Sequence, residues 1–144
     1  MNKNVISARE KAHFLKFIQN FSPSKALKER WLYFYEKLTP RHWSAIEPWK
    51  YWDFEPTNYA QMELTEACFQ NIRLHPYIAQ YVTKINEVVT VASGHSEPAV
   101  YTESKNNFFN GFPENLPLEC VVSFVPGRLV MVLNHDGMAM ILKR

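Results

Sequence analysis

The first apolar residues of the chain recur at helical spacing. Between residues 7 and 20 they stand three or four positions apart, which predicts a helix. Ser7 followed by Glu10 is typical of a capping box, where each side chain accepts a hydrogen bond from the other residue's backbone N–H. Ser22 before Pro23 predicts the start of a second helix. The buried face expected for the first helix is Ala8, Ala12, Leu15 and Ile18.

The second helix has the clearest apolar stripe. Its members stand four, three and four positions apart: Leu27, Trp31, Phe34 and Leu38. At about 100° per residue they share one narrow face, which predicts that this face is buried. A separate stripe on the flank of that face contains Arg30, Tyr33 and Lys37. Thr39 before Pro40 repeats the cap-and-proline pattern and predicts a short helix through Ile46.

The middle of the chain is punctuated by prolines. Two of them bracket residues 47–56, so we expect an ordered connector with large aromatic side chains there, not a long helix. A third substantial helix is expected over residues 57–74, interrupted by His75-Pro76. Its inward residues would be Met62, Phe69 and Ile72. Helical spacing then resumes at Ile78, Tyr81, Val82 and Ile85.

From residue 88 onward the pattern changes to short strands separated by turn residues. The expected strands are 88–92, 99–103, 118–125, 129–133 and 138–142. Strands so close in sequence pair antiparallel through hairpins. The last two are apolar on both faces, which favours central positions, with one face against the helices and the other open to a partner.

Together these elements predict an α+β fold, because helices and strands are segregated along the chain. We expect about four N-terminal helices packed on a C-terminal antiparallel sheet of four to five strands. The length of 144 residues favours a single domain over 1–144, with a mainly helical half (1–86) and a mainly β half (87–144).

Composition leaves the predicted fold unchanged but indicates a globular protein without membrane spans. A hydrophobic content of 47% with 21% charged residues is typical of a globular chain. No stretch approaches the roughly 20 apolar residues of a membrane span, and charge precedes any apolar run at the N-terminus. With only two cysteines, Cys68 and Cys120, in apolar surroundings, we expect a cytoplasmic protein that does not associate with membranes.

Charge is spread unevenly along the chain. Residues 1–50 hold ten Lys/Arg against four Asp/Glu, whereas residues 51–144 hold six against ten. A basic half attracts either phosphate backbones or an acidic protein. Nucleic-acid binding is therefore our second hypothesis, with phosphate contacts expected from Lys25, Lys28, Arg30, Lys37 and Arg41.

Motifs that specify chemistry are missing from the sequence. There is no phosphate-binding glycine motif, and Cys68 and His75, seven positions apart, lack the spacing of zinc ligands, so we expect no metal and no cofactor. A Cys68–His75 nucleophile pair or a His95-Ser96-Glu97 constellation has equally little support. An enzyme assembled in space is the third hypothesis, with first substitutions at His42, His95, Glu97 and His135.

Aromatic residues supply the first hypothesis. Nine lie between residues 31 and 54, and three phenylalanines lie in residues 106–117, where Asn, Gly and Pro predict a loop. Either set could fill the core or, because Trp and Tyr dominate interface energetics, contact a partner. We expect a non-enzymatic protein-binding module, an inhibitor or immunity-type protein that blocks an enzyme or toxin, and we leave a homodimer open. The expected contact residues are Trp43, Trp49, Tyr51, Trp52, Phe108, Phe109 and Phe112.

Overall fold

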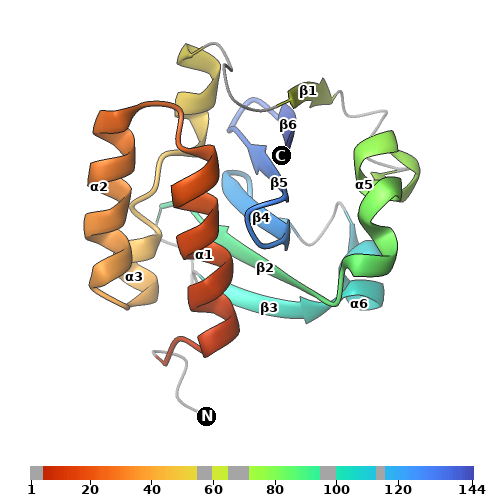
Figure 1. The fold of residues 1–144 in the computed structure, drawn as a ribbon, viewed down its shortest axis with the longest axis horizontal. Coiled ribbons are helices and arrows are strands. Elements are labelled where there is room, and N and C mark those ends of the chain that lie inside the picture. The colour runs from red at the N-terminus through yellow and green to blue at the C-terminus, as the bar shows by residue number, and fades with distance from the viewer. Residues whose placement is uncertain (1–4, 55–59, 65–71, 95–99, 113–115) are drawn as a thin grey trace.

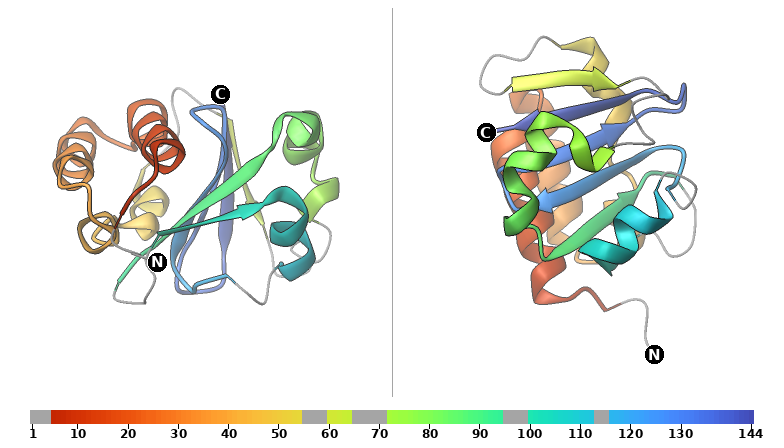
Figure 2. Two further views of the ribbon diagram at one scale, coloured as in Figure 1. Left: turned by 90° about the horizontal axis from the view of Figure 1, so that it is seen from below. Right: turned by 90° about the vertical axis from the view of Figure 1, so that its right-hand side faces the viewer.

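An antiparallel sheet lies between two helical layers in the computed structural model, which describes residues 5–54, 60–64, 72–94, 100–112 and 116–144 (Figures 1 and 2). Within the described residues the sheet has six strands, in the order β1-β6-β5-β4-β2-β3. The strands are β1 (Ala60–Leu64), β2 (Glu87–Ala92), β3 (Val100–Ser104), β4 (Cys120–Val125), β5 (Leu129–Leu133) and β6 (Ala139–Lys143).

One helical layer comes from the N-terminal third of the chain. It comprises α1 (Ala8–Phe21), α2 (Lys25–Glu36), α3 (Pro40–Trp43) and the 3-10 helix η1 (Pro48–Asp53). The opposite layer is smaller and is built later in the sequence. It comprises η2 (Ile72–Leu74), α5 (Pro76–Tyr81), η3 (Val82–Lys84) and α6 (Lys105–Gly111). Figure 2 shows the two layers on opposite sides of the sheet.

The α+β class and most of the expected elements are confirmed. Both hydrogen bonds of the capping box are present, between Ser7 Oγ and the Glu10 N–H (3.1 Å) and between Glu10 Oε1 and the Ser7 N–H (2.9 Å). The second helix begins later than expected, because Ser24, and not Ser22, accepts a hydrogen bond from the Leu27 N–H. The expected cap at Thr39 is correct.

The buried face of α1 differs from the expected one. Ala8 and Ala12 are exposed and Leu15 is half-buried, while Ile18 is buried as expected. The residues buried on α1 are His13, Phe14, Phe17, Ile18 and Phe21. Because a phenylalanine buries far more apolar area than an alanine, the stripe that contains the large rings is the one that faces the sheet.

The helix expected over residues 57–74 is wrong. Residues 60–64 form β1, which pairs antiparallel with β6 from Ala60↔Lys143 to Leu64↔Ala139. Ile72 is buried, as expected, but in η2; Phe69 lies outside the described residues. The strand forms because β6 offers an edge with which it can pair, and such tertiary pairing overrides local helical spacing.

The four inner strands of the sheet, β2, β4, β5 and β6, are buried on both faces by other parts of the chain. One core joins α1, α2, α3 and η1 to the residues on the sheet face that points toward these helices, such as Val89, Val121 and Val132. The second core joins α5 and α6 to the alternate residues, such as Val122 and Met131. The expectation that a partner covers this second face is therefore wrong: α5 and α6 cover it. The central position of β5 and the burial of β6 are confirmed.

The segment expected to be a loop at 106–117 contains α6. Ser104 caps this helix by accepting a hydrogen bond from the Asn107 N–H at 3.3 Å. Phe108 is 4% exposed, and its ring centroid lies 5.4 Å from that of Phe124 in β4. The phenylalanines thus fold back onto the sheet, which was one of the two expected arrangements. No helix among the described residues is long and apolar enough to span a membrane.

Candidate functional site

Three of the expected contact residues lie in the cores. Trp43 is fully buried, and its indole N–H donates to the Tyr35 carbonyl at 3.1 Å. Tyr51 is 1% exposed, and its hydroxyl donates to the Phe21 carbonyl at 2.7 Å. Phe108 is buried in the second core. These three side chains stabilise the fold and present no surface to a partner, so their assignment as contact residues is wrong.

The other expected contact residues are half-buried. Trp52 packs against the first core, and Phe109 and Phe112 pack against the second, on the opposite side of the sheet. Trp49 lies in η1 and is also half-buried. The aromatic residues of the two segments therefore do not form one surface, and the role of these four in partner binding stays a prediction.

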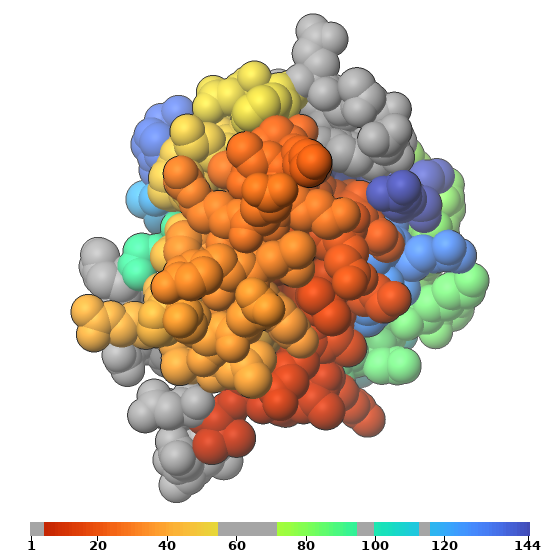
Figure 3. Space-filling model, turned by 60° about the vertical axis from the view of Figure 1, so that its left-hand side comes forward, coloured from red at the N-terminus to blue at the C-terminus, as the bar shows by residue number. Residues whose placement is uncertain are grey.

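Tyr33 on the outer surface of α2 and Leu38 just beyond its end are large apolar residues that neither core covers. The expectation that Leu38 belongs to the buried face of the helix is wrong, because the helix ends at Glu36. Tyr33 is 54% exposed and Leu38 is 40% exposed. The Lys37 ammonium lies 4.6 Å from the centroid of the Tyr33 ring, a cation–π contact that fixes the ring on the surface. Figure 3 views the molecule from the side of this helix, drawn in orange. We call Tyr33, Lys37 and Leu38 the α2 patch.

The backbone of Leu38 is left-handed, with φ of 53°, and among the described residues it is the one non-glycine residue with positive φ. It follows the last turn of α2, and its N–H donates to the Tyr35 carbonyl at 3.0 Å. This is the position at which helices usually carry glycine. A left-handed conformation costs an L-residue about 1–2 kcal/mol. The chain therefore has a leucine at a position where glycine would adopt the same backbone conformation without strain.

The basic residues of the second hypothesis line this same surface, but carboxylates lie among them. Lys25, Arg30, Lys37 and Arg41 are exposed on α2 and α3, and Lys28 is half-buried. Arg30 bonds Glu47 of the connector at 2.9 Å and 3.2 Å. Glu29 and Glu36 are exposed on α2 as well. The surface therefore carries both signs of charge.

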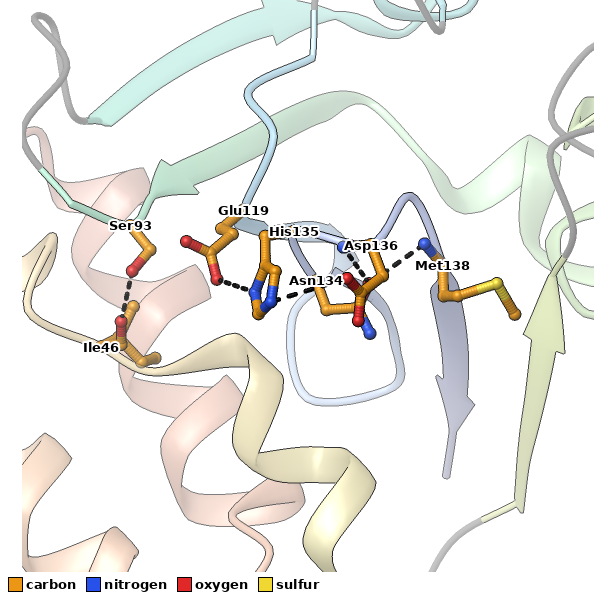
Figure 4. A network of polar contacts seen from close by, with 7 residues as sticks. All are labelled: Ile46, Ser93, Glu119, Asn134, His135, Asp136 and Met138. Atoms are coloured by element: carbon orange, nitrogen blue, oxygen red, sulfur yellow. Dashed lines mark hydrogen bonds and ion pairs between the residues drawn. The ribbon is translucent and has the colours of Figure 1, made fainter.

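The histidines of the enzyme hypothesis serve local structure. His42 bonds the capping Thr39 through Nδ1 at 2.6 Å. In the turn between β5 and β6, His135 lies between Glu119 (3.1 Å) and Asp136 (3.6 Å) (Figure 4). Asn134 Oδ1 shapes that turn by accepting hydrogen bonds from two backbone N–H groups, those of Asp136 and Met138. The expected turn at Asp136-Gly137 is confirmed by the φ of 77° at Gly137.

The remaining residues considered for chemistry are Cys68, His95, Ser96 and Glu97, which lie outside the described residues. His75 accepts a hydrogen bond from the Tyr77 N–H and so caps α5. In the part of the chain that the structure describes, no three His, Cys, Asp or Glu side chains are grouped as metal ligands.

A hollow of about 370 Å³ opens where β2 and β4 separate. Pairing between these strands ends at Val89↔Ser123. Beyond Ser123 the register of β4 against β5 shifts before Val125. The helix α1 reaches this point through His13, whose Nδ1 lies 2.7 Å from Ser123 Oγ. The lining residues are Arg9 and His13 from α1, Lys84 from η3, Asn86 and Glu87 at the start of β2, and Phe124 and Pro126 at the end of β4.

His13 is the most unusual side chain of the hollow. It is 7% exposed, and its Nδ1 lies 2.7 Å from Ser123 Oγ. Burial, with a smaller contribution from the Arg9 guanidinium, lowers the pKa of His13 from 6.5 to about 4. The ring is therefore neutral at pH 7. Arg9 forms an ion pair with Glu87 at the rim.

Sequence reasoning missed both His13 and Ser123. The signal for His13 was its place beside Phe14 and one helical turn before Phe17. The signal for Ser123 was a polar residue among the apolar positions of a strand, which implies a partner across the core.

Comparisons with known proteins do not assign this chain to a class, since no family model, no curated protein and no solved structure matches it.

Proposed function

We propose that this chain is a protein-binding module that blocks a partner protein by covering part of its surface, as a small inhibitor or immunity protein does. The observation that carries the proposal is Leu38, an exposed leucine in a left-handed conformation. Strained residues persist where function retains them, and they cluster at binding sites. An apolar side chain held outward at a cost in stability favours a contact surface.

The α2 patch also has the composition of a binding hot spot. Aromatic residues dominate such sites, and charged residues surround them at the rim. Here Tyr33 and Leu38 supply the apolar centre, while Lys37 and Arg41 supply positive charge. None of the ion pairs among the described residues neutralises these two cations. A partner with an apolar depression flanked by carboxylates fits this arrangement.

The mixed charge of α2 favours a protein over a nucleic acid. Glu29 and Glu36 stand beside Tyr33 on the exposed side of the helix, because they precede and follow it at helical spacing. A phosphate backbone that approached Tyr33 would meet these two carboxylates. Arg30 is already bonded to Glu47. A protein surface, which carries both signs of charge, meets no such repulsion.

The test is a nuclease-treated pull-down from lysate of the source cells with two matched double variants. Tyr33→Ala/Leu38→Gly removes the patch, while Leu74→Ala/Leu118→Ala removes two apolar side chains that are 73% and 67% exposed on other elements. We expect the first variant to retain at least about tenfold less of the protein captured by the wild type. The control variant should retain it fully.

The fold should survive both changes, because all four side chains are exposed. Equal thermal unfolding midpoints within a few degrees would establish this. Equal capture by both variants would contradict the proposal, and so would captured material that disappears with nuclease treatment.

A further inference from the structure

We propose that the hollow between β2 and β4 binds a small organic carboxylate. Its volume of about 370 Å³ falls at the lower end of the range of ligand sites, roughly 300–1,000 Å³. The hollow lies on the edge between the two helical layers, away from the α2 patch, and its function does not depend on partner binding.

The first element of the site is a buried imidazole with one nitrogen available to the hollow. His13 Nδ1 is bonded to Ser123, and no described residue bonds Nε2. When the Ser123 hydroxyl donates to Nδ1, the ring proton lies on Nε2 and points to the ligand. Among the described residues, Trp31 Nε1 is the one fully buried side-chain nitrogen or oxygen without a hydrogen-bond partner, so Nε2 of His13 is accessible from the hollow. A carboxylate oxygen that enters the hollow accepts a charge-assisted hydrogen bond from it.

Ser123 holds the ring and does not react. It is 3% exposed and does not line the hollow, so a ligand in the hollow cannot reach its hydroxyl. When its hydroxyl donates to His13 Nδ1, this bond places the ring proton on Nε2. Ser123 is thus a positioning residue.

The charges of the site favour a single negative charge on the ligand. Arg9 and Glu87 neutralise each other at the rim, while Lys84 is not part of an ion pair among the described residues. The net charge around the hollow is therefore one positive. Phe124 and Pro126 give one wall apolar character, which suits the hydrocarbon part of an organic acid better than a fully hydrated inorganic anion.

The probe is sodium benzoate, titrated into the full chain labelled with 15N at pH 7, with sodium chloride at equal ionic strength as the reference. We expect a saturable shift of the His13 Nε2 resonance. His42 and His135, which lie exposed on other elements, serve as internal controls and should not shift. An unchanged His13 resonance would overturn the proposal, and tighter binding of inorganic phosphate would overturn the assignment to a carboxylate.

Charge variants give the proposal a sign test. Lys84→Gln should weaken benzoate binding about threefold to fivefold, and Glu87→Gln, which frees Arg9, should strengthen it by a similar factor. Lys25→Gln removes the same charge from the start of α2 and should leave affinity unchanged. Equal effects of Lys84→Gln and Glu87→Gln would contradict the site.

Ser123→Ala tests the positioning role separately from the charges. It should weaken benzoate binding and also change the 15N shifts that report the His13 tautomer in the free protein. A variant that keeps the tautomer of the wild type would show that Ser123 does not position the ring. None of these readouts involves a protein partner, so their failure leaves the proposed function standing.

Discussion

At the scale of single residues, His13 links the stability of the fold to pH. The folded chain holds this imidazole neutral because burial lowers its pKa to about 4, whereas an unfolded chain binds a proton near pH 6.5. Between these values the unfolded state carries one more proton than the folded state. Protonation of His13 therefore leaves the free energy of unfolding unchanged above pH 6.5 and lowers it as the pH drops toward 4.

We predict that His13 accounts for a loss of about 3 kcal/mol in the free energy of unfolding between pH 7 and pH 4. Urea unfolding of the wild type and of His13→Gln at several pH values measures this contribution. The variant cannot be protonated, so its stability should fall less than that of the wild type over the same range. Parallel pH profiles for the two proteins would show that His13 is not the cause.

The sequence shows that nine aromatic residues lie between 31 and 54 but not which of their rings are buried. Trp31, Trp43 and Tyr51 are the largest fully buried side chains, although Trp43 and Tyr51 were expected to contact a partner. Which rings remain outside depends on how α1, α2 and η1 pack together. Contacts between distant segments decide that packing, so the spacing of residues within one segment does not predict it.

At the scale of elements, the predictions that were confirmed came from signals that act within one segment. The capping box at Ser7 is such a case, because both partners lie within one turn. The five later strands appeared within about two residues of their expected bounds, because alternation and turn residues are local properties. The strand β1 was missed because its pairing partner, β6, lies at the far end of the chain.

The helix α6 forms where the composition of the chain predicts a loop, because Phe108 is buried in the second core. Asn, Gly and Pro around 106–117 suggested a loop, yet Phe108 anchors a helix to β4.

We predict that Phe108→Ala lowers the free energy of unfolding by about 3 kcal/mol or more, since it empties a buried site. Asn107→Ala, an exposed neighbour, should change it by less than about 0.5 kcal/mol. Denaturant unfolding compares the two, and equal small effects would place Phe108 outside the core.

At the scale of the whole molecule, each helical layer covers one face of the sheet. The α5 and α6 layer closes a sheet face that the sequence left open for a partner, and this removes the sheet as a contact surface. The outer side of the helical layer built from α1 to α3 carries two exposed large apolar residues, Tyr33 and Leu38, among charges of both signs. The contact surface that we propose is therefore the α2 patch, in place of the buried aromatic residues.

The candidate sites could not be predicted from local patterns because their residues meet only after folding. His13 and Ser123 are 110 positions apart and touch because α1 crosses the end of β4. The hollow beside them is lined by residues of α1, η3, β2 and the end of β4, which are distant in sequence. By contrast, the stripe of Arg30, Tyr33 and Lys37 lies on one helix, and the sequence alone identified it as separate from the buried face.

Hydrogen–deuterium exchange of the chain, free and bound to the protein captured in the pull-down, tests the central claim most directly. We predict slower exchange in the complex for the amides from Lys37 to Trp43, which follow α2 and form α3, and unchanged exchange in α5 and α6. Protection confined to α5 and α6, with the amides around Leu38 unchanged, would contradict the assignment of the α2 patch as the binding surface.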